Sequence, residues 1–487
     1  MQPKTDFDIA IIGAGIVGLA TAYKIALAHP SLRICLFEKE KEIAAHQTGH
    51  NSGVIHSGLY YQPGSIKAKT CREGRRELVE FAQKHHIPFD MCGKIVVATH
   101  PSEVARLDQL YERAQANQLA GVEKIDAHQI KEIEPECSGI AGLRVPCTGI
   151  IDFVQVARTL AEQVQAIHAE NRLKLEHRVI GFDRHDYYTK LVTNQGPFRV
   201  RNIVNCAGLQ SDRIADLVDV RLDMRIVPFR GEYHQLIGAA KDKVKHLIYP
   251  VPDPRFPFLG VHFTRTIGGE VECGPNAVFS WKREGYHRLS FDFRDSWDAL
   301  SFAGTRALFR KNLRYGIREY AHSLCKPLLV RQLKRLIPSV TSADLQRGHC
   351  GVRAQAVSRN GEPVDDFKIE RAEHPATTFV FSPSSDAKKI SEEDTGPSEG
   401  LKSDLANGDI PYRKLTWDDF PTTANGPRGL FAYTASYIRW SYLTKTTRTG
   451  DGYSAQVTSI EFRSGLDVKK TWRRQDLSQK DLDRLLP

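Results

Sequence analysis

The sequence contains no C-x-x-C pair, although its 487 residues include nine cysteines, which are scattered and odd in number. This distribution argues against a disulfide framework and a thiolate zinc site. It favours a reduced protein, so we expect a cytoplasmic location. The sequence also lacks any run approaching the ~18 uninterrupted apolar residues that a bilayer-spanning helix needs. Any membrane contact is therefore expected to be peripheral, at the inner membrane face.

The chain has neither an internal repeat nor a strong excess of one charge. Its 68 lysines and arginines stand against 58 acidic residues, which gives a net charge of +10. This moderate balance favours anionic partners and leaves metabolites, phospholipid headgroups and nucleic acid open. Hydrophobic residues at 41% with charged residues at 26% are typical of a folded globular protein. At ~100 to 200 residues per domain, the length predicts two to four domains.

The N-terminal segment imitates a signal peptide, because residues 9–23 are uncharged and Ala-Leu-Ala follows at 26–28. Aspartates before this segment and three ordered glycines inside it favour a folded unit instead. We predict a buried strand over Phe7–Ile12 and a helix over Ile16–Leu27.

The turn between this strand and helix reads Gly-Ala-Gly-Ile-Val-Gly. In such a fingerprint Gly13 permits the tight turn, Gly15 lets the backbone approach a pyrophosphate, and Gly18 lets helix and strand pack closely. The diphosphate then lies at the helix N-terminus, where free N–H groups and the helix dipole favour negative charge.

A second predicted strand, Arg33–Phe37, ends at Glu38, which follows Gly18 by 20 residues. A carboxylate at this position can accept hydrogen bonds from a ribose diol. Strand, turn, helix, strand and acid in this order predict a dinucleotide site, but they do not separate NAD from FAD.

The next loop, Thr48–Gly58, favours FAD, because its glycines, hydroxyls and amides suit close approach to a ribityl chain and a flavin ring. A later strand, Asn202–Cys206, leads into another turn and a helix near the cofactor. Beside the glycines and Glu38, the expected cofactor contacts are Lys39, Thr48, Asn51, Ser52, Gly53, Ala207 and Gly208.

These segments resemble the L-2-hydroxyglutarate dehydrogenase/oxidase branch of the D-amino-acid-oxidase-like flavoproteins. Further similar stretches are Tyr60–Ser65, Gly260–Val278 and Gly351–Ala356, and the resemblance covers residues 5–370. It implies oxidation of L-2-hydroxyglutarate, a small dicarboxylate, to 2-oxoglutarate, with electrons passed from FAD to a quinone or to oxygen. It implies no nucleic-acid partner. Another flavin enzyme, such as a glycerol-3-phosphate dehydrogenase or an amine oxidase, and an adaptor protein with a relic flavoprotein domain are the alternatives.

The resemblance implies an α/β fold (α+β overall), in which an FAD-binding Rossmann-like domain is interleaved with a mixed-sheet substrate domain. The expected FAD-binding segments are 1–95, 150–225 and 330–385, and the expected substrate segments are 96–149 and 226–329. Within the substrate domain, Arg225–Ile237 and Leu247–Val278 are expected to form β-rich runs. Asp292–Ser323 is a basic helical stretch, and it suits either a solvated face or contact with anionic lipid.

Oxidation of a 2-hydroxy acid needs a base for the hydroxyl proton and cations for the carboxylates. A histidine suits the first task, and His56 is the first candidate and His262 the second. The resemblance implies that Arg353 makes a bidentate contact with one carboxylate, as a guanidinium can. The candidates for the distal carboxylate are Arg230, Tyr233 and Arg265. Hydrogen bonding or ion pairing within the fold is the structural alternative for these residues.

The C-terminal part departs from the expected pattern. Thr378–Ser385 is a loose imitation of the family's final strand and turn, and 386–410 has the composition of a linker. Residues 411–487 suggest a small β-rich module, for which Tyr412–Phe420 and the alternation in Leu430–Tyr442 are the main signals. This module has no H-E-x-x-H motif, so we expect no metal site.

Overall fold

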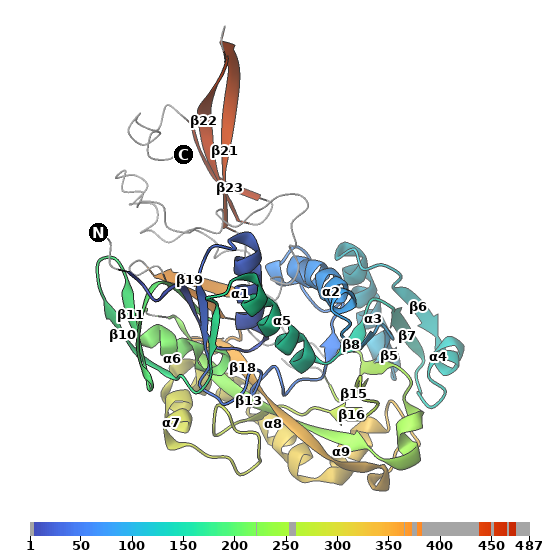
Figure 1. Ribbon diagram of the computed structural model, residues 1–487. Coiled ribbons are helices and arrows are strands. Elements are labelled where there is room, and N and C mark those ends of the chain that lie inside the picture. The colour runs from blue at the N-terminus through green and yellow to red at the C-terminus, as the bar shows by residue number, and fades with distance from the viewer. Residues whose placement is uncertain are drawn as a thin grey trace. The chain divides into compact units, whose positions relative to one another are not determined.

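The computed structural model describes residues 4–220, 222–252, 260–364, 366–372, 377–381, 438–449, 452–464 and 467–473. The chain divides into two compact units, residues 1–389 with 427–434, and residues 390–426 with 435–487. The first unit contains two large sheets and the helices packed on them (Figure 1).

An eight-stranded sheet carries the predicted nucleotide fold. Its strand order is β10-β11-β12-β1-β2-β9, with β20 paired to β12 and β19 to β20. The central strands β1, β2, β12 and β20 run parallel. The strands are β1 (Phe7–Ile12), β2 (Ile34–Phe37), β9 (Arg172–Lys174), β10 (Val179–Arg184), β11 (Thr189–Thr193), β12 (Gly196–Asn205), β19 (Lys368–Ala372) and β20 (Thr377–Phe381).

Helices α1 (Ile16–Ala28) and α5 (Phe153–Ile167) pack side by side against this sheet (Figure 1). Every residue of β1 and β2 is buried, as expected for parallel strands covered on both faces. The turn after β12 is formed by the short helices η1 (Gly208–Gln210) and α6 (Ser211–Asp216). The strand and helix predicted around the glycine fingerprint are therefore confirmed.

A nine-stranded sheet contains most of the strands of the segments expected to bind substrate, with the order β17-β13-β16-β15-β14-β5-β7-β6 and β18 paired to β13. Alternate residues of β5 enter two separate cores, Ile95 and Val97 on one face and Val96 and Ala98 on the other. The strands are β5 (Lys94–Ala98), β6 (Glu123–Asp126), β7 (Ala141–Val145), β13 (Met224–Leu236), β14 (Leu247–Pro250), β15 (His262–Arg265), β16 (Val271–Gly274), β17 (Val278–Phe279) and β18 (Leu345–Ser358).

Most of the remaining helices pack on this second sheet and its edges, whereas the helix over residues 66–84 contacts α1 through Tyr23 and Phe81. A small sheet of β3 (Val54–Ile55), β8 (Gly149–Ile151) and β4 (Phe89–Asp90) completes the unit. The helices are α2 (Ile66–Lys84), α3 (Pro101–Ala116), α4 (Ala127–Ile133), α7 (Phe293–Ser301), α8 (Ala303–Leu324) and α9 (Lys326–Leu333), with the short η2 (Gly238–Lys243) and η3 (Ser342–Asp344). Across the described ranges, none of the helices combines the length and the hydropathy that a membrane span requires.

The structure differs from the expected segments at β18. This strand falls in the segment expected to bind FAD, but it pairs antiparallel with β13 from Met224↔Ser358 to Leu236↔Leu345 and so belongs to the second sheet. Residues 377–381 do return to the first sheet, because β20 pairs in parallel with the end of β12. The turn expected after this strand lies outside the described residues.

The second unit contains a three-stranded antiparallel sheet of β21 (Ile438–Thr449), β22 (Gly452–Ser464) and β23 (Asp467–Arg473). The predicted β-rich character of the C-terminal part is confirmed for these residues. The expected linker 386–410 and the Tyr412–Phe420 motif lie outside the described residues.

Candidate active site

A cavity of about 750 Å³ lies where the carboxyl ends of β1, β2 and β12 approach β13 and β18. In open α/β sheets this edge is the usual ligand site. The main lining segments are the glycine turn, the loop from Ala44 to His56, the turn from Cys206 to Gln210, and parts of β13 and β18. Both large sheets therefore contribute walls to one cavity.

The glycine turn has the close approaches that its sequence predicts. Gly13 has φ +101°, and a Cβ there would lie 2.5 Å from the carbonyl oxygen of Cys206. A Cβ on Gly18 would lie 2.0 Å from the carbonyl oxygen of Gly13. Gly15 lines the cavity at the N-cap position of α1. The turn thus brings main-chain atoms and the start of α1 to the cavity without intervening side chains.

Glu38 is buried at the end of β2 and lines the cavity. Its Oε2 accepts a hydrogen bond from the backbone N–H of Ala14 at 2.9 Å, and its Oε1 accepts one from the N–H of Glu40 at 3.0 Å. These two bonds fix the carboxylate beside the glycine turn. Carboxylate oxygens can accept further hydrogen bonds, so Glu38 retains capacity for a ribose diol.

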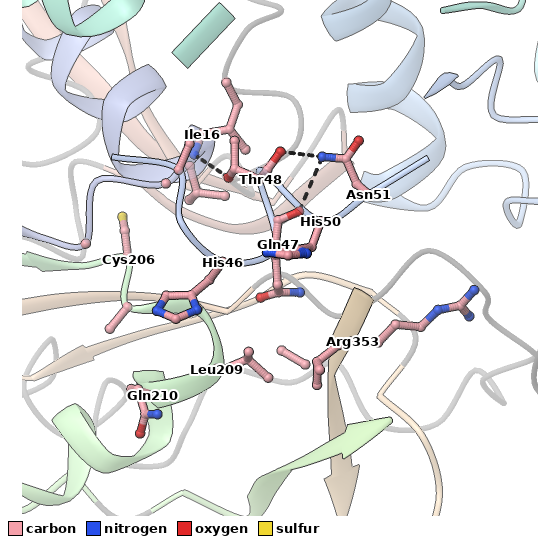
Figure 2. A pocket seen from close by; sticks show the side chains of 18 of the residues that line it. Ile16, His46, Gln47, Thr48, His50, Asn51, Cys206, Leu209, Gln210 and Arg353 are labelled. Carbon is pink, nitrogen blue, oxygen red and sulfur yellow. Dashed lines mark hydrogen bonds between the residues drawn. The ribbon is translucent and has the colours of Figure 1, made fainter. Parts of the chain in front are cut away.

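The loop after β2 is attached to α1 through Thr48, whose Oγ1 accepts a hydrogen bond from the N–H of Ile16 at 2.9 Å (Figure 2). Within the loop, Asn51 donates to the carbonyl oxygen of Thr48 and accepts from the N–H of Gly53 at 2.7 Å. Gly53 has φ +65°. Thr48, Asn51 and Ser52 line the cavity, and the first two also determine the shape of the loop.

The turn after β12 forms the opposite wall. Ala207 donates its N–H to Oδ1 of Asn205 at 3.1 Å, and Gly208 has φ +53°. A Cβ on Gly208 would lie 3.2 Å from the Gln47 side chain. The predicted Ala207 and Gly208 both line the cavity, and Gly208 faces the loop that carries Thr48.

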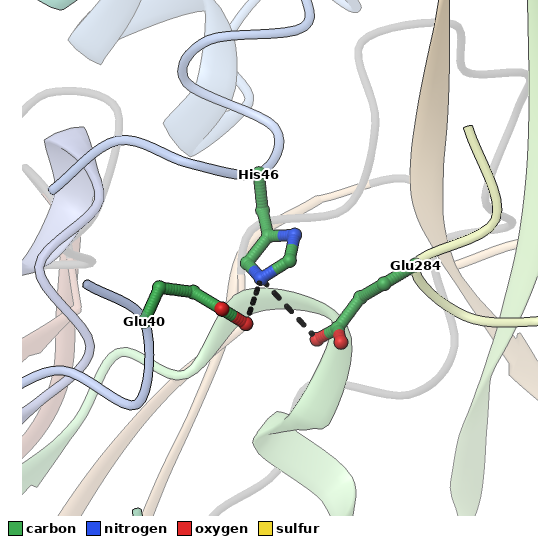
Figure 3. Close-up of side chains that lie close together, drawn as sticks. All are labelled: Glu40, His46 and Glu284. Carbon is green, nitrogen blue, oxygen red and sulfur yellow. Dashed lines mark hydrogen bonds and ion pairs between the residues drawn. The ribbon is translucent and has the colours of Figure 1, made fainter. Parts of the chain in front are cut away.

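Lys39 lies in a cluster with Glu40, His46 and Glu284. Figure 3 shows the histidine between the two carboxylates. Its Nζ is 2.7 Å from Nε2 of His46 and 3.0 Å from Oε1 of Glu284. Burial would raise the pKa of Glu40, but hydrogen bonds from Lys39 and His46 outweigh it and lower the pKa to about 2. The histidine nitrogen and the carboxylate oxygens of this cluster are of the kind that can bind a metal ion. Because the Lys39 ammonium already supplies a positive charge beside them, we interpret the cluster as an ion-pair network.

Sequence reasoning missed an aromatic stack that continues from this cluster beside the cavity. Nδ1 of His46 is 3.0 Å from the hydroxyl oxygen of Tyr286, and the Tyr286 ring stacks on His50 with centroids 3.9 Å apart. Burial lowers the pKa of His50 and raises the pKa of Tyr286. Both groups therefore favour the neutral form. His46 and His50 belong to the His-Gln-Thr-Gly-His stretch. Two histidines four residues apart in one glycine-containing loop could have indicated that both lie at the cavity.

Three of the six predicted catalytic and substrate-binding residues line the cavity, namely His56, Tyr233 and Arg353. His56 follows the small strand β3, Tyr233 lies on β13, and Arg353 lies on β18 (Figure 2 shows Arg353). The structure brings these residues from three separate segments to one cavity that also contains the glycine turn.

The other three predicted residues are absent from the described lining. Arg230 is buried, with Nη2 3.0 Å from Oε1 of Glu232 and Nη1 donating to the carbonyl oxygen of His287. Its charge is therefore satisfied inside the second sheet. Arg265 forms an ion pair with Asp90.

His262 is buried on β15, where Nδ1 lies 2.8 Å from the carbonyl oxygen of Gly260. Its ring stacks on Tyr249 with centroids 4.2 Å apart. For these three residues, the contacts match the structural roles considered as alternatives.

Lys94 was also missed by sequence reasoning. It is buried at the start of β5, with Nζ 4.4 Å from the ring centroid of Tyr60 and 5.1 Å from that of Tyr249. Burial lowers its pKa to about 8. Its flanking residues, Gly93 and Ile95, read as an ordinary strand start, and nothing in the local pattern indicates that the ammonium is enclosed by two aromatic rings.

Residues 8–384 match the family of FAD dependent oxidoreductases (DAO), and the chain belongs to this family. It is thus an FAD-dependent oxidoreductase, as the resemblance of its motifs implied. The fold class and the cofactor predicted from the sequence are confirmed.

Within the family, the chain is similar to L-2-hydroxyglutarate dehydrogenases. It is 46% identical to that of Indibacter alkaliphilus, with 78% of this chain and 94% of that protein covered. It is 43% identical to the mitochondrial human enzyme, with 75% and 81% covered. A solved structure of L-alpha-glycerophosphate oxidase from Mycoplasma pneumoniae with FAD bound has a TM-score of 0.61 at 23% identity, with 77% and 88% covered. At that identity the similarity describes the fold.

The cavity residues fit this cofactor. The main-chain cradle at Gly13 and Gly15 suits a diphosphate, and the carboxylate of Glu38 suits a ribose. The remaining length of the cavity reaches β18, where Gly351 approaches the loop so closely that a Cβ would lie 2.5 Å from the carbonyl oxygen of His50. The cavity thus runs from the nucleotide fingerprint to the second sheet. A reacting flavin ring needs a substrate-binding surface beside it, and the second sheet lies at that end of the cavity.

Proposed function

We propose that this protein oxidises L-2-hydroxyglutarate to 2-oxoglutarate. The observation that carries the proposal is the identity of 42–46% to L-2-hydroxyglutarate dehydrogenases of both bacteria and animals, over 74–78% of this chain. The family match over residues 8–384 includes the glycine turn, the loop with His56 and the strand with Arg353.

When bound, FAD supplies the acceptor for the hydride that leaves the substrate α-carbon. We propose that His56 removes the hydroxyl proton, so that the C–O bond becomes a carbonyl. A histidine suits this task because its ordinary pKa lies near neutrality. Its position in the loop that lines the cavity supports the assignment.

We propose that Arg353 binds one substrate carboxylate and that Tyr233 contributes to binding the other. A guanidinium can form two parallel hydrogen bonds with a carboxylate, which would fix the orientation of the α-carbon. Arg353 and Tyr233 lie on the paired strands β18 and β13. Substrate contacts on one rigid ladder would keep the two carboxylates at a fixed separation, which favours a dicarboxylate of one length.

The proposed electron acceptor is a quinone, with oxygen as the alternative. The reduced cofactor must be reoxidised in each cycle, and a quinone would connect the reaction with a membrane. The two acceptors are separated by following reoxidation of the substrate-reduced protein with a soluble quinone analogue and, separately, with oxygen.

The test of the substrate is anaerobic reduction of the bound flavin. L-2-hydroxyglutarate is expected to bleach the flavin absorption band, and D-2-hydroxyglutarate is the matched control that differs only in configuration. If glycerol 3-phosphate or a secondary amine bleaches the flavin and L-2-hydroxyglutarate does not, the proposed substrate assignment is overturned. A folded protein purified without a flavin band and unable to take up FAD would favour the adaptor hypothesis.

A further inference from the structure

The helices α8 and α9 carry many cations and almost no acids of their own, although Glu362 from a neighbouring segment lies 3.9 Å from Lys311. Residues 303–335 contain nine lysines and arginines and one acidic residue, Glu319. Glu319 is buried and accepts a hydrogen bond from the N–H of Ala277 at 3.2 Å, so its charge is directed into the protein. The cations are Arg306, Arg310, Lys311, Arg314, Arg318, Lys326, Arg331, Lys334 and Arg335.

Large apolar side chains are exposed among these cations. On α8, Leu313 is 62% exposed, Ile317 63% and Leu324 74%. Their spacing of four and seven residues places them on one face of the helix. Leu289 is 95% exposed, and the bond from Arg288 to the carbonyl oxygen of Ser323 brings its loop to the same end of α8. A helix face that contacts only solvent has no need for several large apolar side chains in a row, so this stripe indicates a binding surface.

A hollow of about 540 Å³ lies between α8 and α9. It is lined by Arg318, His322, Leu328, Arg331, Gln332 and Arg335. Arg335 forms an ion pair with Glu103 at 2.7 Å, whereas Arg331 is exposed and has no carboxylate partner among the described residues. Guanidinium groups gathered in this way complement a phosphate group.

We propose that the α8–α9 surface binds the surface of a bilayer containing anionic phospholipid. The arginines of the hollow contact the headgroup phosphate, and the exposed leucines and Ile317 enter the boundary between headgroups and acyl chains. Nucleic acid would use the same cations but would leave the apolar stripe exposed to water. The combination of stripe and cations therefore favours lipid, and this inference does not depend on the identity of the substrate.

The test is sedimentation of the full-length holoprotein with vesicles of phosphatidylcholine, with and without phosphatidylglycerol. Binding is expected with the anionic vesicles and is expected to weaken as ionic strength rises. The variant Arg314→Gln/Arg318→Gln/Arg331→Gln should bind roughly 100-fold more weakly, since each cation near an anionic surface contributes roughly fivefold.

The matched control removes three exposed cations elsewhere, in the variant Arg76→Gln/Lys84→Gln/Arg199→Gln, and should bind like the unaltered protein. Equal binding of the two triple variants would overturn the proposal, as would equal binding to neutral and anionic vesicles. Anaerobic flavin reduction should be the same in both variants, which shows that each is folded and separates this test from that of the substrate.

A second variant tests the apolar stripe without changing the charge. Leu313→Ser/Ile317→Ser/Leu324→Ser should lose most vesicle binding, because burial of the stripe contributes to the affinity. Unchanged vesicle binding would overturn the role of the stripe. Tight binding of duplex DNA by the unaltered protein, with no vesicle binding, would assign the surface to nucleic acid instead.

Discussion

Oγ1 of Thr48 accepts a hydrogen bond from the backbone N–H of Ile16 at 2.9 Å, although 32 residues separate the two positions. The first N–H groups of a helix have no partner within the helix, so a side chain from elsewhere can satisfy one of them. Thr48 does this for α1 and thereby joins the loop to the glycine turn. The loop and the glycine turn, which both line the cavity, are therefore joined into one hydrogen-bonded unit.

Replacement of Thr48 by valine should weaken FAD binding about 5- to 10-fold, because the loss of a capping bond costs about 1 kcal/mol. Thr48→Ser keeps the hydroxyl and is the matched control, with binding expected within about twofold of the unaltered protein. Titration of apoprotein with FAD, followed by flavin fluorescence, measures both. Unchanged affinity of Thr48→Val would show that the loop is held by other contacts.

Replacement of Gly18 by alanine should destabilise the first unit by about 3 kcal/mol, because the new methyl would overlap the carbonyl oxygen of Gly13. Gly316→Ala is the matched control in α8, where a Cβ meets no atom within 4 Å. That change should stabilise by about 0.8 kcal/mol through helix propensity. Thermal unfolding of both holoproteins checks the prediction, and equal melting temperatures would contradict it.

If His56 is the base, His56→Asn should slow anaerobic flavin reduction about 10²- to 10⁴-fold while changing the substrate dissociation constant little. The pH dependence of the reduction rate should also lose the limb that reports the base. His262→Gln is the comparison, since His262 is bonded to Gly260 and lies outside the described lining. A loss of rate confined to the His262 variant would assign the base to β15.

Arg353→Lys retains the charge but removes the planar pair of donors. It should raise the dissociation constant for L-2-hydroxyglutarate about 10- to 100-fold and leave FAD affinity unchanged. Rapid-mixing flavin reduction at varied substrate concentration separates binding from the reduction rate. If the affinity for substrate is unchanged, the carboxylate must be bound by another residue.

Replacement of Lys94 by methionine should change how stability depends on pH. The folded-state pKa is lowered to about 8 from an ordinary 10.5, so the folded protein binds fewer protons than the unfolded chain between these values. The stability of the unaltered protein therefore gains a contribution of about 3 kcal/mol as pH rises from 8 to 10.5.

Lys94→Met lacks this contribution and should be more stable than the unaltered protein below pH 8, with the advantage shrinking above it. The difference in unfolding free energy between the two proteins, measured at pH 7 and pH 10, isolates the effect from other titrating groups. The exposed Lys84→Met is the control and should show no such difference. An advantage that grows with pH would contradict the assignment.

The parts of the site encoded by local spacing could be predicted from the sequence. Gly13, Gly18 and Glu38 are recognisable because a strand, a turn and a helix place them within one short segment. The ion-pair partner of Arg230 could also have been predicted, since Glu232 follows by two residues and shares its face of β13. Weighing that neighbour would have favoured an ion pair over substrate binding.

Other features depend on chain segments that no local pattern connects. The partner of Arg265 is Asp90, 175 residues away. The pairing of β18 with β13 likewise joins segments more than a hundred residues apart, and it moves Arg353 from the expected nucleotide-binding sheet to the second sheet. Strand propensity predicts that such strands exist, whereas their neighbours are decided by the packing of the whole unit.

The interleaving of the two sheets also sets when the protein can acquire its cofactor during synthesis. The glycine turn emerges from the ribosome first, but the facing wall with Gly351 and Arg353 belongs to β18, and β20 beside β12 follows later still. A nascent chain therefore lacks a complete cavity until most of the first unit has been translated. Capture of the flavin in a complete cavity consequently follows translation of most of the first unit.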